Sequence, residues 1–210
     1  MYQNFVFDVD ATLYPASCGI ENECNNLCIK FFIEQLRMSK DEAVQAIENL
    51  RKEYGYESSV MDKKYGVSEK EYLEYVCDTR VDKISSNFEL NELLNKAPQQ
   101  KFILTDAPKS HAVKVLKKLG VLERMFVDIF DPEAAGFTYK YQDEMFERFF
   151  TVNKINPQQS VFFEDKEANL EQGKKFGMTT VLISEMSIEA PNYVDYQFKN
   201  INNALNFFIK

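Results

Sequence analysis

The sequence predicts an α/β protein built on a doubly wound parallel sheet, with a helical insertion near its start. Short apolar runs rich in Phe, Val and Ile alternate with amphipathic helical patterns through the second half of the chain. This alternation is typical of parallel strands joined by right-handed crossovers, with helices on both faces of the sheet. The length of 210 residues allows one such core and a modest appendage.

The first expected strand lies in residues 2–9, YQNFVFDV, and ends in polar residues at Asp8 and Asp10. A continuous apolar run of this kind is typical of a strand buried on both faces. From about residue 20 to residue 96, apolar residues recur at helical spacing only. We therefore expect an α/β core formed by residues 1–15 and 97–210, and a helical domain formed by residues 16–96.

The second half continues with a strand in KFILTDA, which begins at Lys101, and a helix in SHAVKVLKKLG, which ends at Gly120 as its C-cap. Three further strands are expected in MFVDIF, SVFFED and MTTVLIS. The amphipathic segments DEMFERFFTV and ANLEQGKKFG lie between them and predict helices. This order of elements supports the doubly wound sheet.

Composition and charge exclude several classes of partner. Acidic residues exceed basic ones by 33 to 25, a formal net charge of -8, which argues against binding a nucleic acid polymer through a basic face. The sequence has no signal-like start and no apolar run long enough to span a membrane, so we expect a cytoplasmic protein with no membrane partner. The thiols are then expected to be reduced and packed in helices: Cys18, Cys24, Cys28 and Cys77.

Polar residues cluster where the predicted strands end, and the carboxyl ends of parallel strands meet at one edge of a sheet. Four carboxyl groups there offer the hard oxygen ligands that Mg²⁺ prefers, and Lys140 and Thr105 are suited to hold phosphate oxygens. The sequence therefore predicts a site for a divalent cation and a phosphate group. The expected metal ligands are Asp8, Asp10, Glu164 and Asp165. The single histidine, His111, excludes histidine-rich metal sites, and we expect it only to pack at the start of its helix.

The first strand end, FDVDATLYP, resembles the D-x-D-x-T motif of the haloacid dehalogenase superfamily of phosphotransferases. The resemblance places Asp8 at the position of the nucleophile and Asp10 at the position of the acid/base. LTDA resembles the second motif, with Thr105 as its hydroxyl residue, and Lys140 falls where the family has its third-motif lysine. FFEDKEANL resembles the acidic fourth motif, which supplies the metal-binding Glu164 and Asp165. Four motifs in this order are specific evidence.

Within this superfamily the chain is most similar to pyrimidine 5′-nucleotidase-like phosphatases. The similarity rests on LYP after the first motif, KEYG at residues 52–55, and HA at residues 111–112. It implies a Rossmann-like core, a helical cap, bound Mg²⁺ and an aspartyl-phosphate intermediate on Asp8. The implied substrate is a nucleoside monophosphate or another small phosphate ester. The implied catalytic residues are Asp8, Asp10, Thr105 and Lys140, and the implied substrate-binding residues are Thr105, Asp106 and Lys140.

Two positions depart from the family pattern. Asp106 replaces the usual Asn of the second motif, and Tyr141 replaces the common Pro after the lysine. A carboxylate beside a phosphate dianion is repulsive unless it points away, so Asp106 is expected to weaken phosphate binding. Three alternatives stay open: a phosphomutase, a 2-haloacid dehalogenase, and a non-catalytic binding or regulatory protein with this fold.

Overall fold

The computed structural model describes residues 2–186 and 189–209, and it contains two compact units. Residues 1–18 and 81–210 form the unit that contains the sheet, and residues 19–80 form a helical unit. Among the described residues, no helix combines the length and the apolar character that crossing a bilayer requires.

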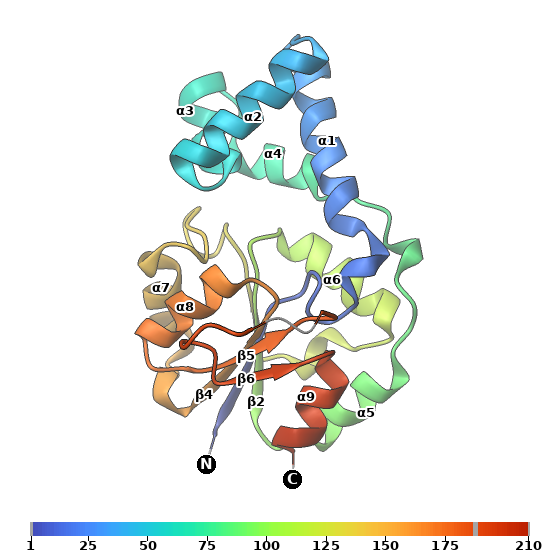
Figure 1. Ribbon diagram of the computed structural model, residues 1–210, viewed down its shortest axis with the longest axis vertical. Coiled ribbons are helices and arrows are strands. Elements are labelled where there is room, and N and C mark those ends of the chain that lie inside the picture. Colours follow the sequence, from blue (N-terminus) through green and yellow to red (C-terminus); the bar gives the residue numbers. More distant parts are fainter. Residues whose placement is uncertain (1, 187–188, 210) are drawn as a thin grey trace. The chain divides into compact units, whose positions relative to one another are not determined.

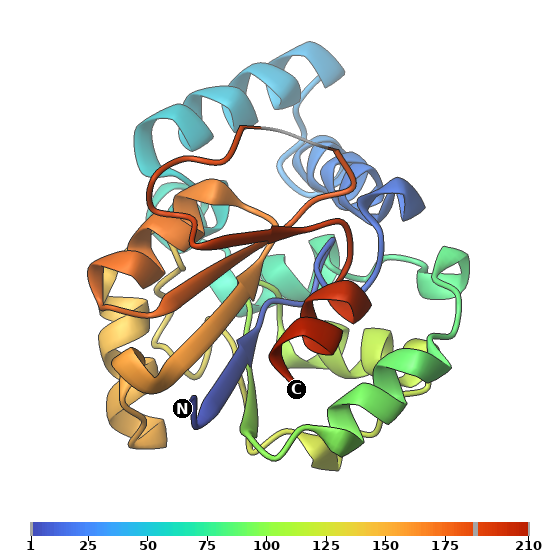
Figure 2. The same cartoon turned by 60° about the horizontal axis from the view of Figure 1, so that its bottom comes forward.

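The sheet has six parallel strands in the order β3-β2-β1-β4-β5-β6 (Figures 1 and 2). The strands are β1 (Asn4–Phe7), β2 (Gln100–Leu104), β3 (Asp128–Phe130), β4 (Ser160–Glu164), β5 (Thr179–Ile183) and β6 (Tyr196–Phe198). Strand β1 lies between β2 and β4, with Phe7 opposite both Ile103 and Phe163. The chain order reverses at β1, and ligands bind in doubly wound sheets at such a reversal. The predicted fold class is confirmed.

Helices cover both faces of the sheet (Figure 2). On one face lie α7 (Asp143–Asn153) and α8 (Glu167–Lys175), and on the other lie α5 (Phe88–Lys96), α6 (Lys109–Leu119) and α9 (Ile201–Phe208). Phe146 and Phe149 of α7 are fully buried against strand residues such as Phe102 and Phe162. Phe163 faces the opposite layer, where its ring packs edge-on against that of Phe208 with the ring centroids 5.7 Å apart. Each face of the sheet therefore has its own apolar core.

The structure adds two elements to the predicted ones and moves a boundary. Strand β6 and helix α9 are absent from the sequence prediction. Strand β6 has only three residues and pairs only with β5, so it is too short to show a pattern. Helix α5 packs against α9 and belongs to the unit with the sheet. The helical unit therefore ends at residue 80, not at residue 96 as expected, because the periodicity of an amphipathic helix does not reveal which core it faces.

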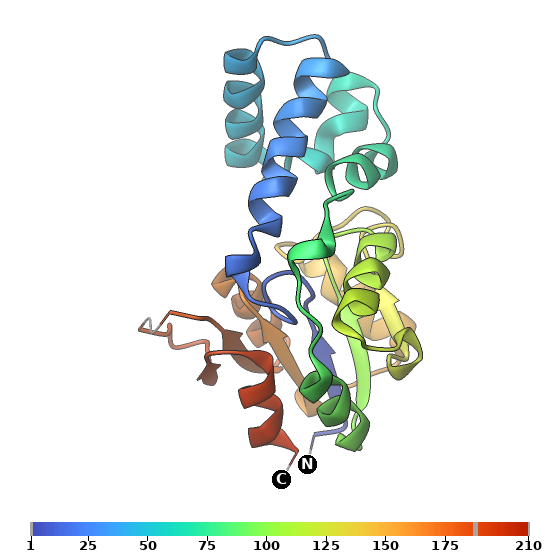
Figure 3. The same cartoon turned by 90° about the vertical axis from the view of Figure 1, so that its right-hand side faces the viewer.

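The helical unit consists of α1 (Ile20–Glu34), α2 (Lys40–Tyr54), α3 (Met61–Tyr65) and α4 (Glu69–Val76). Helices α1 and α2 run side by side within it (Figure 3). Its apolar core includes Phe31 and Phe32 of α1 and Tyr72 of α4, with ring centroids of Phe31 and Tyr72 5.0 Å apart. This unit therefore has a hydrophobic core of its own.

A polar network is buried in this helical core around Glu57. Arg51 donates two hydrogen bonds to its carboxylate, from Nε to Oε2 at 2.6 Å and from Nη2 to Oε1 at 3.0 Å. The hydroxyl of Tyr72 and the thiol of Cys28 also donate to Oε1, at 3.0 and 3.3 Å. A buried charge is tolerated when it is paired and fully hydrogen-bonded, as Glu57 is here. Cys28 thus serves the packing role expected for the cysteines.

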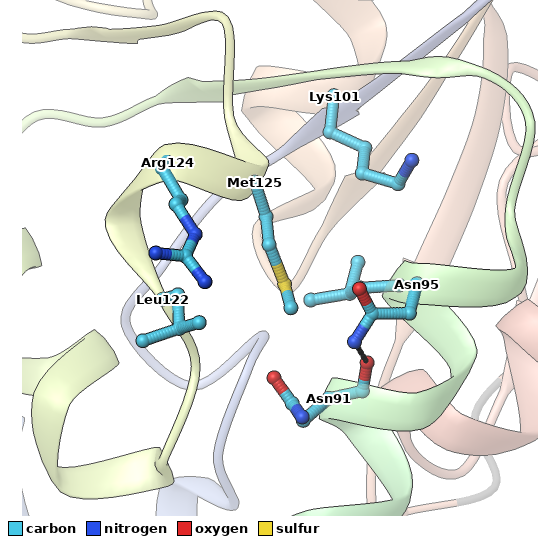
Figure 4. Close-up of a pocket in the computed structure, with 7 residues that line it drawn as sticks. Asn91, Asn95, Lys101, Leu122, Arg124 and Met125 are labelled. Carbon is cyan, nitrogen blue, oxygen red and sulfur yellow. Dashed lines mark hydrogen bonds between the residues drawn. The ribbon is translucent and has the colours of Figure 1, made fainter.

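A polar pocket of about 420 Å³ lies near the beginning of β2, where Lys101, Arg124, Asn91 and Asn95 line it (Figure 4). The ammonium of Lys101 already donates to the carbonyl oxygens of Ala97 and Gln99, at 2.7 and 2.8 Å. None of the candidate site residues lines this pocket. It is therefore separate from the predicted site, which lies where the strands end.

We expect Arg51→Ala to lower the free energy of unfolding by about 3 kcal/mol, because it leaves the buried Glu57 without its counter-charge. Chemical denaturation followed by circular dichroism measures this loss. Lys96→Ala is the control, because its ion pair with Glu92 is exposed and is worth less than about 1 kcal/mol. Equal losses in the two variants would contradict a structural role for the network.

Candidate active site

The first motif forms a turn directly after β1. The amide of Asp8 still donates to the carbonyl of Phe163 at 2.9 Å, so this residue is held by the sheet itself. Ala11 then adopts a left-handed conformation with φ of 59°, and the amide of Leu13 returns to the carbonyl of Val9 at 3.0 Å. Within this turn, the hydroxyl of Thr12 donates to Oδ2 of Asp8 at 3.0 Å. The sequence did not assign a role to Thr12, which the structure shows fixing the orientation of the Asp8 carboxyl group.

Lys140 is the centre of the polar cluster. It lies in the loop before α7, as expected, and its side chain is 2% exposed. Its ammonium donates to Oδ1 of Asp8 at 2.5 Å and to Oε2 of Glu164 at 2.7 Å. Burial alone would lower the pKa of Lys140, but these two carboxylates outweigh it and hold the pKa well above its usual value. Lys140 therefore carries a fixed positive charge between the ends of β1 and β4.

Three carboxyl groups come together beside this ammonium. Asp8, Glu164 and Asp165 each place one oxygen within 4.8 Å of the others. Burial, followed by the charge of Glu164, raises the pKa of Asp8 to about 7 and that of Asp165 to about 10. One lysine does not balance three carboxylates, so the cluster takes up protons or a cation.

The donor set of this cluster suits Mg²⁺, because it offers only hard carboxylate oxygens. Glu164 is already occupied: Oε2 accepts from Lys140, and Oε1 accepts from the amides of Asp165 and Lys166 at 3.2 and 3.1 Å. Lys166 is the N-cap residue of α8, so Glu164 also holds the start of that helix. Asp8 and Asp165 are therefore the residues best placed to hold the ion.

The second motif follows β2. Thr105 is buried, and its oxygen accepts a hydrogen bond from the amide of Ala107 at 3.1 Å, which leaves the hydroxyl hydrogen to be donated. Oδ1 of Asp106 accepts from the backbone amide of Lys140 at 2.9 Å. Burial raises the pKa of Asp106. One oxygen of Asp106 therefore ties the second motif to the Lys140 loop, and the family's usual Asn carries an amide oxygen able to accept the same bond.

Asp10 has surroundings of its own. Its Oδ1 accepts from the hydroxyl of Tyr14 at 2.5 Å and lies 2.7 Å from Nε2 of His111. Burial alone would raise the pKa of Asp10, but His111 and Tyr14 outweigh it and lower the pKa. The Asp10 carboxyl lies outside the cluster of Asp8, Glu164 and Asp165. Tyr14 and His111 engage Oδ1 of Asp10 and leave Oδ2, so its expected role as a metal ligand stays a prediction.

His111 is the site residue that sequence reasoning missed, since we expected it only to pack. It is indeed buried, 3% exposed, but its imidazole meets a carboxyl group 101 positions earlier in the chain. The HA string that contributed to the family resemblance was the one available signal.

The sequence profile of the haloacid dehalogenase-like hydrolases matches residues 5–183. The chain belongs to this family.

Its relatives include phosphate metabolism protein 8 of Saccharomyces cerevisiae, with 28% identity over 93% of this chain; the chain spans 66% of that protein's length. Among solved structures, a HAD phosphatase from Thermococcus onnurineus has a TM-score of 0.68 and 17% identity, covering 98% of this chain and 97% of its own. The magnesium-bound HAD-hydrolase YfnB from Bacillus subtilis has a TM-score of 0.63 and 18% identity, covering 100% and 99%.

A β-phosphoglucomutase from Clostridium difficile has the same fold, with a TM-score of 0.61 and 19% identity over 100% of this chain and 99% of its own. The fold therefore does not select one reaction within the family, and the choice depends on the residues of the site.

In this protein we expect the rise in melting temperature caused by Mg²⁺ to be larger at about pH 8 than at about pH 6. The raised pKa values of Asp8 and Asp165 mean that the folded protein without metal binds protons that the unfolded chain releases. Stability without metal therefore falls as pH rises through about 7 and towards about 10, while fewer protons then compete with the cation. Thermal denaturation with and without MgCl₂ measures the difference.

Asp165→Asn should remove most of the Mg²⁺ effect, because it removes an oxygen ligand of the cluster. Asp143→Asn is the matched control, since Asp143 is exposed on α7 and should leave the effect intact. An equal response in both variants would place the ion elsewhere.

Proposed function

We propose that this hydrolase is a Mg²⁺-dependent phosphomonoesterase that acts through an aspartyl phosphate on Asp8. The observation that carries the proposal is the set of contacts around Asp8, where Thr12 holds one oxygen and the buried ammonium of Lys140 holds the other. A carboxylate fixed in this way beside further cation ligands suits attack on a phosphoryl group.

The reaction proceeds in two displacements. A carboxylate oxygen of Asp8 forms a bond to phosphorus while the ester P–O bond breaks, and Asp10 donates a proton to the departing oxygen. A water molecule then attacks the phosphorus of the aspartyl phosphate, gives its proton to Asp10, and releases inorganic phosphate and the free Asp8 carboxylate. The chain thus returns to its starting protonation state after each turnover.

The remaining residues neutralise charge on the transferring group. The ammonium of Lys140 and the hydroxyl of Thr105 are the donors assigned to the phosphate oxygens. Asp8 and Asp165 would hold Mg²⁺, with Glu164 fixing Lys140 beside them. When bound, the ion supplies positive charge to the phosphoryl oxygens.

The proposed substrate is a nucleoside monophosphate or another small phosphorylated metabolite. The similarity to pyrimidine 5′-nucleotidase-like phosphatases supports this class, and the matching yeast protein is named for phosphate metabolism. We assign residues 19–80 the role of the cap that selects the leaving group, and the cytoplasm as the location. The four free cysteines are consistent with that compartment.

The alternatives are less well supported. Dehalogenation at carbon does not require a proton donor to an ester oxygen. In this chain Asp10 of the first motif is held by contacts with Tyr14 and His111, as a proton donor would be. A binding protein without turnover does not require the Lys140 network that orients Asp8. No contact in the described part of the site favours a phosphomutase over a phosphatase.

We expect the wild-type enzyme to release phosphate from at least one member of a panel of nucleoside monophosphates and sugar phosphates, and to lose this activity with EDTA. Asp8→Asn should reduce turnover by about a thousandfold or more, because the amide is not a nucleophile. Asp143→Asn serves as the control. If no ester is cleaved while Mg²⁺ still raises the melting temperature, the phosphatase proposal fails and a binding protein without turnover becomes the better-supported function.

Asp106→Asn should lower KM for the phosphate ester while leaving the free energy of unfolding within about 0.5 kcal/mol of wild type. The amide oxygen keeps the bond to the Lys140 backbone, while a negative charge near the phosphate is removed. Steady-state kinetics and denaturation measure both quantities. Asp106→Ala is the comparison, because it also removes the bond and should destabilise the loop. An unchanged KM in Asp106→Asn would show that this carboxyl does not act on the phosphate.

A further inference from the structure

We propose that His111 is a positioning residue which, together with Tyr14, holds Oδ1 of Asp10 on the buried side so that Oδ2 is turned toward the leaving group. This inference rests on the proposed phosphatase function and adds residues to its acid/base step.

The two contacts on Asp10 converge on one atom. Tyr14 donates from its hydroxyl at 2.5 Å, and Nε2 of His111 lies at 2.7 Å from the same Oδ1. Oδ2 has no hydrogen-bond partner among residues 2–186 and 189–209, and the Asp10 side chain is 37% exposed while that of His111 is 4% exposed. The arrangement therefore engages one oxygen on the buried side and leaves the other available.

The two contacts on Oδ1 fix the rotation of the Asp10 carboxyl group. Tyr14 donates to Oδ1, and we assign His111 the tautomer that carries its hydrogen on Nε2, so that both groups donate to the same oxygen. With Oδ1 held in this way, Oδ2 is the oxygen left to meet the substrate. The same oxygen is then the one that delivers the proton in the first displacement and receives it in the second.

His111 is held by the fold rather than by a flexible loop. It lies in the first turn of α6, and its amide donates to the carbonyl of Pro108 at 2.9 Å. Helix α6 has no side-chain cap of its own at this end. Instead, Oδ2 of Asp131, at the end of β3, accepts from the amide of Lys109 at 2.8 Å, while Oδ1 accepts from Ala134 at 2.9 Å. The hydrogen bond from Lys109 to Asp131 fixes the start of the helix, and with it the position of the buried imidazole of His111.

Tyr14 approaches from a different element, the turn after β1, and is itself 5% exposed. Asp10 is therefore held from two sides by groups whose own orientations are fixed by packing. Positioning residues contribute to the reaction rate by holding a catalytic group in this way, since misplacing such a group lowers the rate by about a hundredfold.

The test uses the dependence of proton donation on the leaving group. A nucleoside monophosphate leaves as a strongly basic alkoxide and needs the proton, whereas p-nitrophenolate is a weakly basic leaving group and needs it little. The quantity to compare is kcat/KM for the two esters, because it reports the steps up to the first displacement.

We expect His111→Leu to lower kcat/KM for the nucleoside monophosphate by about a hundredfold and for p-nitrophenyl phosphate by less than about threefold. His111→Gln should recover much of the loss, because its side-chain amide places a donor near the position of Nε2. Tyr14→Phe should show the same selectivity, and the Tyr14→Phe, His111→Leu pair should lose less than the product of the single effects.

Lys117→Gln, an exposed position on the same helix, is the matched control, and melting temperatures confirm that each variant is folded. Equal losses for the two esters, or no loss for either, in a folded His111→Leu protein or, where that variant does not fold, in a folded Tyr14→Phe protein, would overturn the positioning role while leaving the phosphatase intact. If the wild-type enzyme cleaves neither ester, the proposed function itself fails, and this inference fails with it.

Discussion

The buried ammonium of Lys140 is the interaction on which the rest of the site depends. A charge that is 2% exposed is costly unless carboxylates surround it, and Asp8 and Glu164 supply two at 2.5 and 2.7 Å. These carboxylates lie at the ends of neighbouring strands, β1 and β4, while the lysine comes from the loop before α7. Asp106 holds the backbone of the same residue. One residue thus joins three strand ends, two through its side chain and one through its backbone amide, and loss of the side chain would leave two buried carboxylates without their common partner.

The same region gives its two aspartates opposite electrostatic surroundings, although only one residue separates them. Asp8 lies among other carboxyl groups, and burial with the charge of Glu164 raises its pKa to about 7 despite Lys140. Asp10 lies against His111 and Tyr14, which lower its pKa. Two acids whose surroundings shift their pKa values in opposite directions commonly have different roles in one reaction. The carboxyl groups around Asp8 favour binding of a cation, whereas Tyr14 and His111 orient the carboxyl group of Asp10.

Much of this arrangement could be predicted from the sequence, because it follows from the ends of buried strands. The apolar runs located β1 to β5, and the polar residues after them predicted that Asp8, Thr105, Lys140 and Asp165 belong to one edge of the sheet. The three residues of β6 are too few to show a pattern, so this strand was missed. Periodicity reports a buried face but not its partner, so α5 was placed in the wrong unit. The contact between His111 and Asp10 was invisible for the same reason, since it depends on how α6 meets the turn after β1 rather than on any spacing.

That turn also shows where the fold accepts strain. Ala11 has φ of 59°, a conformation that costs an ordinary L-residue roughly 1–2 kcal/mol, yet the alanine directly follows Asp10, the second aspartate of the first motif. A left-handed residue at this point reverses the chain so that the amide of Leu13 bonds to Val9, which returns Thr12 to Asp8 and Tyr14 to Asp10. Each aspartate is thus oriented by the residue four positions after it. The strain is confined to one residue and is offset by hydrogen bonds that only this reversal permits, which is the pattern expected where geometry serves chemistry rather than stability.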